Sequence, residues 1–315
     1  MLEKFEGCLI GLAIGDALGM PVEGLPPEII RKRYGKVEDF LPAPDRKLGP
    51  GQFTDDTQMM VIHAESIVEK GEIDPEDLAL RFVRWVKSGS PRGIGLTTLR
   101  AIKRLAKGAS WKESGEEGEF AAGNGVAMRI APVGLLNAWT LERLEEDVEK
   151  AGAITHRNPE ALKGGLAVAY AVAKLVSGVS LGSFLEDVCE FLGPSKVTEN
   201  LRKAGELLSR DVEPEQALEI LGTSGYVVET VASAFYCFLK TPEDFKASVT
   251  AAVMGGNDAD TTAAIAGALS GAFNGILAIP AHWVEKVEEG PYIRKLARAI
   301  YELALKRKEQ GLWNP

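Results

Sequence analysis

The sequence is poor in cysteine and in positive charge. Its three cysteines lie far apart in apolar surroundings, so they have no metal-ligand spacing, and an odd number argues against a disulfide framework. This usage is typical of a protein kept in a reducing compartment. The 36 basic residues are outnumbered by 45 acidic residues, and the formal net charge of −9 makes general nucleic-acid binding unfavourable.

A secretory signal and a membrane span are not expected. The first twenty residues carry Glu3 and Glu6 where a secretory signal would be basic, and Asp16 interrupts their apolar run. The stretch 261–280 comes nearest to a span, but it is rich in Ala and Gly and has two aspartates at its mouth, which favours a buried core helix. The sequence therefore predicts a cytoplasmic protein without membrane contact.

Runs of alternating apolar and polar residues, the pattern of β-strands, are too short to build a sheet. Ala, Leu, Glu, Lys and Arg dominate instead, with Gly or Pro between segments, and this predicts helices through most of the chain. Glycine recurs every fourth residue in two segments, at Gly7, Gly11 and Gly15 and at Gly267, Gly271 and Gly275. Because small residues at this spacing let another backbone approach closely, we expect an all-α, single-domain bundle over residues 1–315 around these two helices.

The predicted helices leave two long irregular stretches, 35–54 and 108–124. Loops of this length in a compact domain are often functional. The helices are expected over 3–17, 57–70, 75–88, 93–107, 125–137, 141–154, 158–178, 181–192, 197–208, 213–221, 227–240, 242–254, 261–277 and 291–309.

Two pairs of aspartates stand where helices are expected to begin. They lie in the runs Thr54-Asp55-Asp56 and Asp258-Ala259-Asp260-Thr261. Helix capping explains part of each pattern, since Thr54 is a good N-cap and acids in the first turn suit the helix dipole. Capping leaves the second aspartate of each pair unexplained, because like charges about 4 Å apart repel by roughly 4 kcal/mol at an effective dielectric of 20.

If the two runs converge, four carboxylates and two or three hydroxyls meet, with no basic residue near them in sequence. Oxygen ligands of this kind suit one or two hard divalent cations, Mg²⁺ or Mn²⁺. The alternative is two capped helix starts that never meet.

Three further motifs are weaker when taken singly. The loop Gly123-Asn124-Gly125 opens an expected helix, where backbone amides can hold an anion, although a structural turn is the ordinary interpretation. A lone histidine such as His156 is more often structural than catalytic. Glu23 lies beyond the first helix, on an expected loop, where the ordinary interpretation is a solvated acid without a function.

In order along the chain, the motifs GDALG…E, TDDT, GNGxAMR, TH and GGxDxDTT resemble the ADP-ribosylglycohydrolase family from about residue 5 to residue 285. The resemblance implies an all-α orthogonal bundle with a dinuclear Mg²⁺ or Mn²⁺ centre. It implies hydrolysis of the glycosidic bond between ADP-ribose and an acceptor. The substrate would be an ADP-ribosylated protein or a small ADP-ribose conjugate. By analogy with bacterial members, ADP-ribosyl-arginine is favoured over ADP-ribosyl-serine.

The resemblance also gives roles to single residues. It implies the metal ligands Thr54, Asp55, Asp56, Asp258, Asp260 and Thr261. Glu23 matches a loop glutamate that acts as acid/base in some members, and Asp56 and Asp260 are expected to be essential for catalysis. The implied substrate-binding residues are Gly123, Asn124, Gly125, His156 and Tyr226. Asn257 is a departure, because many members read GGDxDT there.

Two other functions stay open. A non-catalytic binder of ADP-ribose or a nucleotide can share the fold, although all six ligand positions are retained here. A metal hydrolase acting on phosphate esters is the second, although no Lys or Arg lies near the acids in sequence to clamp a phosphate. Since the chain is net negative, we expect helix N-termini and backbone amides to bind the substrate's phosphates.

Overall fold

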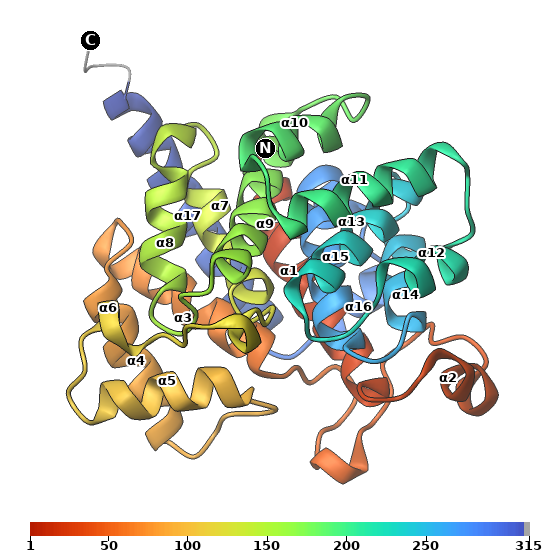
Figure 1. Cartoon of the computed structure of the whole chain (residues 1–315), viewed down its shortest axis with the longest axis horizontal. Helices are drawn as coiled ribbons and strands as arrows, with labels where there is room; N and C mark the ends of the chain where they lie inside the picture. Colours follow the sequence, from red (N-terminus) through yellow and green to blue (C-terminus); the bar gives the residue numbers. More distant parts are fainter. Residues whose placement is uncertain (312–315) are drawn as a thin grey trace.

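The computed structural model describes residues 1–311, which form helices joined by turns and loops, with isolated bridges but no β-strand (Figure 1). The prediction of an all-α fold is confirmed. The helices are α1 (Leu2–Gly19), α2 (Pro27–Tyr34), α3 (Asp55–Lys70), α4 (Pro75–Lys87), α5 (Leu96–Ala106), α6 (Trp111–Ser114), α7 (Ala131–Leu136), α8 (Leu144–Gly152), α9 (Pro159–Ser177), α10 (Phe184–Leu192), α11 (Lys196–Ser209), α12 (Pro214–Leu221), α13 (Val227–Lys240), α14 (Phe245–Met254), α15 (Ala259–Asn274), α16 (Ala281–Lys286) and α17 (Gly290–Gly311).

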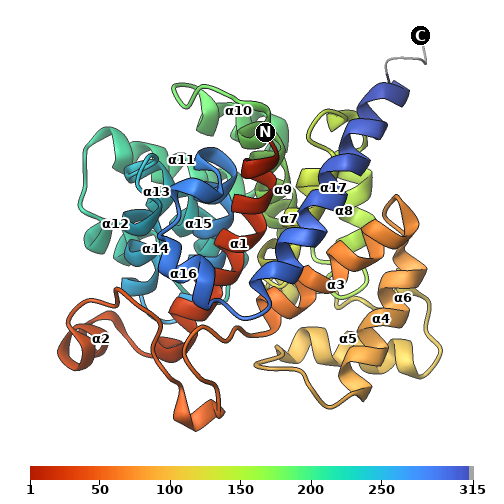
Figure 2. The same cartoon turned by 180° about the vertical axis from the view of Figure 1, so that it is seen from behind.

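Helices α1 and α15 lie side by side at the centre of the molecule (Figures 1 and 2). Nearly every residue of both helices is buried. A Cβ atom placed on Gly7 would lie 2.5 Å from the carbonyl oxygen of Gly271, and one on Gly11 would lie closer still to that of Gly267. The spacing predicted that another backbone approaches each glycine segment, and the structure shows that the two segments face and touch each other.

We expect Gly11→Ala to destabilise the protein by about 3 kcal/mol or more, because its methyl group would overlap the backbone of Gly267 and also press on the ring of Phe245. Gly205→Ala in α11 is the matched control, since its Cβ would meet only the side chain of Leu185, at 3.1 Å. Alanine is the better helix former, so this control should be neutral or stabilising. Urea denaturation of both variants measures the difference, and equal effects would contradict the close approach of α1 and α15.

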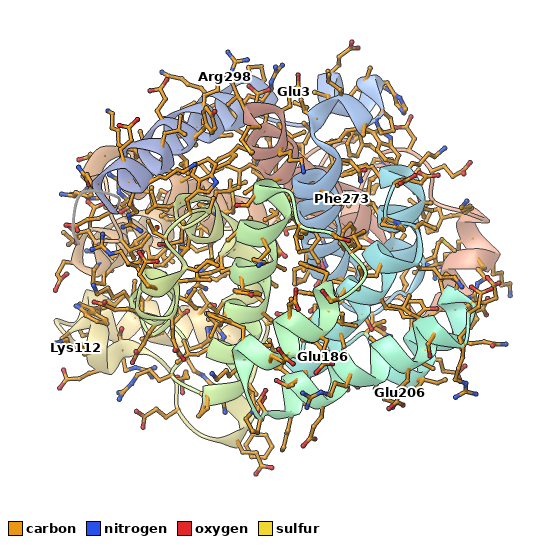
Figure 3. All side chains as sticks on the ribbon, turned by 90° about the horizontal axis from the view of Figure 1, so that it is seen from above. Glu3, Lys112, Glu186, Glu206, Phe273 and Arg298 are labelled. Atoms are coloured by element: carbon orange, nitrogen blue, oxygen red, sulfur yellow. The ribbon has the colours of Figure 1, made fainter. Side chains whose placement is uncertain are left out.

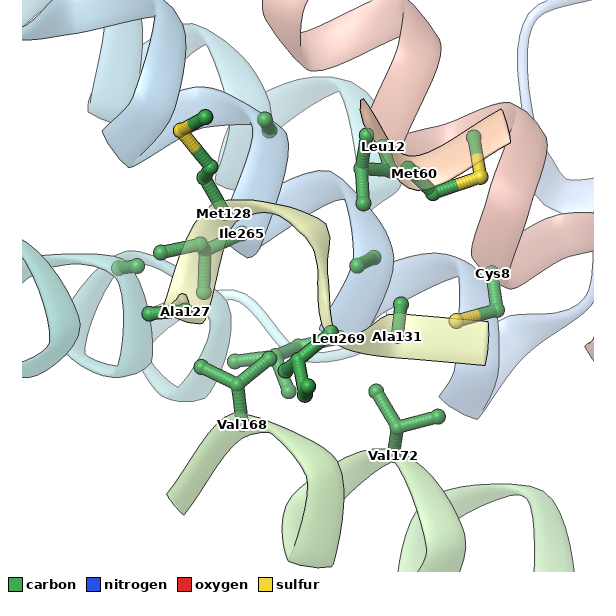
Figure 4. Packing of buried hydrophobic residues seen from close by; sticks show 14 of the residues in the cluster. Cys8, Leu12, Met60, Ala127, Met128, Ala131, Val168, Val172, Ile265 and Leu269 are labelled. Carbon is green, nitrogen blue, oxygen red and sulfur yellow. The ribbon is translucent and has the colours of Figure 1, made fainter. Parts of the chain in front are cut away.

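The core continues from the central pair into the neighbouring helices. Val168 and Val172 of α9 point toward Ile265 and Leu269 of α15, and Leu12 of α1 belongs to the same buried cluster (Figure 4). Charged side chains such as those of Lys112, Glu186 and Glu206 lie at the outside of the molecule (Figure 3). One continuous apolar core thus supports both central helices.

Within residues 1–311, one helical segment is long and apolar enough to cross a membrane, and it is Leu2–Val22 rather than the stretch 261–280. Of its most apolar window, 94% is buried inside the protein. Helix α15 is only 16 residues long. The burial of Leu2–Val22 identifies it as the core helix already described.

The sequence missed three short helices, α2, α6 and α16. Helix α2 has one buried residue, Ile30, and a basic run at its end, so it lacks the apolar stripe by which a helix is recognised. The helix predicted over 125–137 is wrong as a single element. It is a 3₁₀ turn, Ala127–Arg129, followed by α7, because Pro132 lacks an N–H and starts a new helix in its first turn.

Candidate active site

The ends of three helices meet at one side of the central pair. The last turn of α1 lies against the first turn of α15, where a Cβ on Gly19 would lie 2.5 Å from the carbonyl oxygen of Ala259. Asp16, in that last turn of α1, reaches the start of α3. The close packing of α1 on α15 therefore carries the first aspartate run to the second.

Asp16 is fully buried and holds the start of α3. Its carboxylate accepts hydrogen bonds from the backbone N–H groups of Thr54 and Thr57, at 2.9 and 3.0 Å, and from their hydroxyls, at 2.8 and 2.6 Å. Burial raises the pKa of Asp16 to about 6, although these hydrogen bonds act to lower it. The sequence analysis gave this residue no role, and its signal was the one acid inside the apolar run that follows Glu6 in α1.

The expected capping role of Thr54 is wrong. Thr54 occupies the N-cap position of α3, but among the described residues its hydroxyl is bonded to carboxylates and makes no cap bond. Asp258 likewise occupies the N-cap position of α15 without a cap bond within residues 1–311, and its carboxylate accepts from Asn124. Because Asp16 caps α3 from another helix, Asp55 and Asp56 can face the cleft, and Asp258, which makes no cap bond among residues 1–311, lines the same cleft.

A cleft of about 510 Å³ gathers most of the predicted site residues. Its lining includes Glu23, Asp55, Asp56, Asp258, Asp260, Thr261, Gly123, Asn124, Gly125 and His156. Thr54 lies behind this surface, bonded to Asp16. Tyr226 is not among the lining residues of the cleft, although its neighbours Ser224 and Gly225 are, and it pairs with Gly123 through a backbone bridge. An aromatic contact from Tyr226 to the substrate stays a prediction.

The acids of the cleft are close enough to disfavour their charged forms. Oxygens of Glu23, Asp258 and Asp260 all lie within 4.8 Å of one another. Burial, and then the charge of Asp16, raises the pKa of Asp55 to about 8. Burial raises the pKa of Asp56 and of Asp260 well above the ordinary range, and neighbouring carboxylates add to both shifts. Without a counter-charge, the cluster can keep only part of its negative charge.

The donor set fits a hard divalent cation. Every candidate ligand is an oxygen, and Oδ1 of Asp56 is buried without a hydrogen-bond partner among residues 1–311. An orphaned buried carboxylate oxygen costs free energy unless a cation meets it. Asp55, Asp56, Asp258, Asp260 and the hydroxyls of Thr54 and Thr261 can hold such an ion, and Glu23 lies close enough to join them.

No basic residue lies near the aspartate runs in sequence, but the fold brings one to the acids of the cleft. Nη1 of Arg46, from the irregular stretch 35–54, lies 2.5 Å from Oε2 of Glu23. Burial lowers the pKa of Arg46, but the bond to Glu23 and the charges of Asp260 and Asp55 outweigh it and raise the pKa overall. The absence of a basic clamp therefore no longer argues against a phosphate ester as substrate.

The glycine loop packs directly on His156. A Cβ on Gly125 would lie 2.6 Å from Cε1 of the His156 ring, so this position tolerates only glycine. The hydroxyl of Thr155 lies 2.9 Å from Nδ1 of His156, and burial, followed by the charge of Arg129, lowers the pKa of His156 to about 3. His156 is thus a neutral ring at neutral pH, held against the loop and facing the cleft.

Asn124 has a contact that the sequence did not predict. Its side-chain amide donates to Oδ2 of Asp258 at 2.6 Å and to the hydroxyl of Thr230 at 3.0 Å. Its backbone N–H donates to the carbonyl of Gly225 at 3.1 Å. Asn124 therefore orients one candidate metal ligand, and a direct contact with substrate stays a prediction.

Arg129 anchors the loop from behind and was missed as a site residue. Its guanidinium is fully buried and donates to the carbonyl of Gly125 and the hydroxyl of Thr155, both at 2.6 Å, and to Nε2 of His63 at 3.2 Å. Burial lowers the pKa of Arg129 to about 9. The arginine that ends the GNGxAMR motif therefore ties the glycine loop to the Thr155–His156 pair.

Asn257 fixes the loop that carries Glu23. Its φ of +54° is in the left-handed region, which asparagine tolerates better than most residues, and its side chain donates to Thr223 at 2.8 Å. Its carbonyl accepts from the N–H of Gly24 at 2.7 Å, and its own N–H donates to Leu25 at 2.8 Å. The departure from the family motif thus fits a turn that places Glu23 beside Asp258.

We expect the metal-free protein to lose stability as the pH rises from about 4 to about 8. The carboxyls of Asp16 and Asp55 have pKa values of about 6 and about 8 in the folded protein, against 3.8 for an unperturbed aspartate. The folded protein therefore binds more protons than the unfolded chain in this window, and its free energy of unfolding falls as they leave.

Thermal melts in EDTA across that pH range test this trend. Excess Mg²⁺ or Mn²⁺ should oppose it, because carboxylates bind metal in their deprotonated form. A melting temperature that rises with pH in EDTA would contradict the charge repulsion inferred from the cluster.

Comparison with known proteins identifies the class. The family model described as ADP-ribosylglycohydrolase matches residues 1–310. An uncharacterised protein of Archaeoglobus fulgidus is 42% identical over 97% of this chain and 98% of its own length. The ADP-ribosylarginine hydrolase Tri1 of Serratia proteamaculans is 31% identical over 96% of this chain and 80% of its own length.

A solved structure gives the same result. The chain is similar to one from an ADP-ribosylglycohydrolase-related protein complex, with a TM-score of 0.75 and 29% identity over 96% of this chain and 98% of the other. The family model and relatives named as ADP-ribosyl hydrolases place the chain among glycosidic-bond hydrolases. The chain belongs to the ADP-ribosylglycohydrolase family.

Proposed function

We propose that this protein is a divalent-metal-dependent hydrolase that releases ADP-ribose from ADP-ribosyl-arginine, with ADP-ribosyl-serine or a related conjugate as the next candidate. The observation that carries the proposal is the convergence of five acidic side chains with the glycine loop and His156 in one cleft. The volume of the cleft, about 510 Å³, is in the range of small-molecule sites, which is about 300–1,000 Å³.

The proposed cofactors are two Mg²⁺ or Mn²⁺ ions. The residues that would hold them are Thr54, Asp55, Asp56, Asp258, Asp260 and Thr261, supported by the orphaned oxygen of Asp56 and the mutual repulsion of the acids. When bound, such ions supply Lewis-acid chemistry that orients the ribose hydroxyls and makes water easier to deprotonate.

Glu23 is the proposed acid/base. Hydrolysis at the anomeric carbon of ribose passes through an oxocarbenium-like state, so a carboxyl that protonates the leaving group or takes a proton from water accelerates it. Glu23 lines the cleft, and its side chain is partly exposed, which leaves it accessible to both.

The glycine loop is the proposed phosphate site. The N–H of Asn124 already donates to Gly225, whereas those of Gly123 and Gly125 have no acceptor among residues 1–311. Two free amides beside the cleft can hold a pyrophosphate without a basic patch. Arg129 keeps this loop in place through the carbonyl of Gly125.

A turnover assay on ADP-ribosyl-arginine and ADP-ribosyl-serine, with and without Mg²⁺, tests the proposal. Release of ADP-ribose only with metal, and faster from arginine, is the expected result; the preference rests on similarity to a relative named for ADP-ribosylarginine. ADP-ribose binding without turnover of either substrate would favour a non-catalytic binder. Turnover of a phosphate ester alone would favour the other metal hydrolase.

A further inference from the structure

The irregular stretch 35–54 brings the side chain of Arg46 to Glu23, one of the residues that line the cleft. It projects from the lower edge of the molecule between α2 and α3 (Figures 1 and 2). Its tip closes on itself, since Ala43 and Leu48 exchange backbone hydrogen bonds of 2.9 and 3.2 Å around the 3₁₀ turn Pro44–Arg46. Arg46 therefore sits on a self-closed turn, and its side chain is the part that reaches the acids.

The guanidinium of Arg46 lies between Glu23 and the start of α3. Its Nη1 is 2.5 Å from Oε2 of Glu23. A Cβ built on Gly93 would lie 3.8 Å from Nη1 of Arg46 and 3.1 Å from Oδ1 of Asp55, so the two side chains flank the same glycine. Among residues 1–311, Arg46 is the one basic side chain in an ion pair with an acid of the cleft.

We propose that Arg46 is the built-in counter-ion and positioning residue of this site: it holds Glu23 at the mouth of the cleft and competes with divalent cations for the same carboxylate. Glu23 has oxygens within 4.8 Å of those of Asp258 and Asp260 on one side and the guanidinium on the other. A cation that binds Glu23 together with Asp258 and Asp260 must share the Glu23 carboxylate with Arg46 or displace the guanidinium. The positioning part of the proposal rests on Glu23 as the proposed acid/base, and the competition for Glu23 rests on the proposed metal site but not on the hydrolytic activity.

This arrangement predicts opposite effects on metal binding and on turnover. Arg46→Gln removes a positive charge that repels the incoming cation, so Mn²⁺ should bind on the order of 3- to 10-fold more tightly. Glu23 then loses the partner that fixes its side chain, so kcat should fall by about 10- to 100-fold. A residue that only stabilises the loop would weaken both.

Calorimetric titration of the substrate-free protein with Mn²⁺, beside kcat and KM for ADP-ribosyl-arginine, tests the proposal. Lys47→Gln is the matched control, because it removes the same charge from the next, exposed residue of the turn and should leave both readouts unchanged. Arg46→Lys keeps the charge, so it should restore the Mn²⁺ affinity of the native protein and only part of kcat, since lysine lacks the planar fork.

The outcomes separate this inference from the proposed function. Mn²⁺ affinity that is unchanged or weaker in Arg46→Gln would overturn the counter-ion role, whether or not the native protein is active. Tighter Mn²⁺ binding with unchanged kcat would overturn the positioning role. A native protein that binds Mn²⁺ but hydrolyses neither conjugate would count against the proposed function, while the metal titration would still decide the counter-ion role.

Discussion

Asp260→Ala is expected to abolish hydrolysis and yet leave the metal-free protein as stable as before, or more stable. Asp260 is buried among carboxylates, and burial together with Glu23 and Asp258 raises its pKa well above the ordinary range. Removing it relieves repulsion when no metal is present, but it also removes a proposed ligand. We expect kcat to fall by roughly 10³-fold or more, and the same result for Asp56→Ala.

The control is another buried aspartate that has a basic partner. Asp147 lies 2.8 Å from Nη1 of Arg307, and Asn137 donates to it at 2.9 Å. Breaking that pair with Asp147→Ala should cost about 3–5 kcal/mol with or without EDTA. Thermal melts in EDTA distinguish the two classes of aspartate, and a large loss of stability for Asp260→Ala in EDTA would assign it a structural role.

Glu23→Gln is expected to lower kcat by on the order of 10²–10⁴-fold with little change in ADP-ribose affinity. Glutamine keeps the size of the side chain but removes the proton that the carboxyl would transfer. Product affinity should persist, because the proposed metal ligands at the helix starts and the glycine loop lie on other segments of the cleft.

Steady-state kinetics and calorimetric titration with ADP-ribose measure the two quantities for Glu23→Gln. Glu28→Gln, on the exposed face of α2 five residues away, is the control and should behave as the native protein does. Near-normal kcat in Glu23→Gln would mean that the acid/base lies elsewhere.

Much of the fold could be predicted because it depends on patterns in short segments of the sequence. The glycines of α1 and α15 repeat at the spacing of one helix face, and both helices form and meet along those faces. Helix α2 could not be predicted, since a peripheral helix with a single buried residue has no periodic pattern of apolar residues. Pro132 divides the segment 125–137 because it cannot donate a backbone hydrogen bond. This proline is visible in the sequence and should have split the predicted helix.

The candidate site also has parts that the sequence predicted and parts that only the structure revealed. The aspartate runs, the glycine loop and His156 were recognisable as motifs, since each places its residues within a few positions of one another. Their meeting in one cleft depends on the contact of α1 with α15, which no local pattern encodes. Asp16 was taken for an interruption of an apolar run, and only the folded chain shows that it holds both threonines of the TDDT motif.

The sequence by itself determined the helical class, the two glycine faces and the residue types that the chemistry needs, because helix period and ligand chemistry are properties of short segments. The tertiary structure decided which charges meet. It brought Arg46 from a loop to Glu23, buried Arg129 behind the glycine loop and turned Asn124 toward Asp258. Electrostatic energy depends on distance in space rather than along the chain, so the balance of charge in this cleft exists only once the helices are packed.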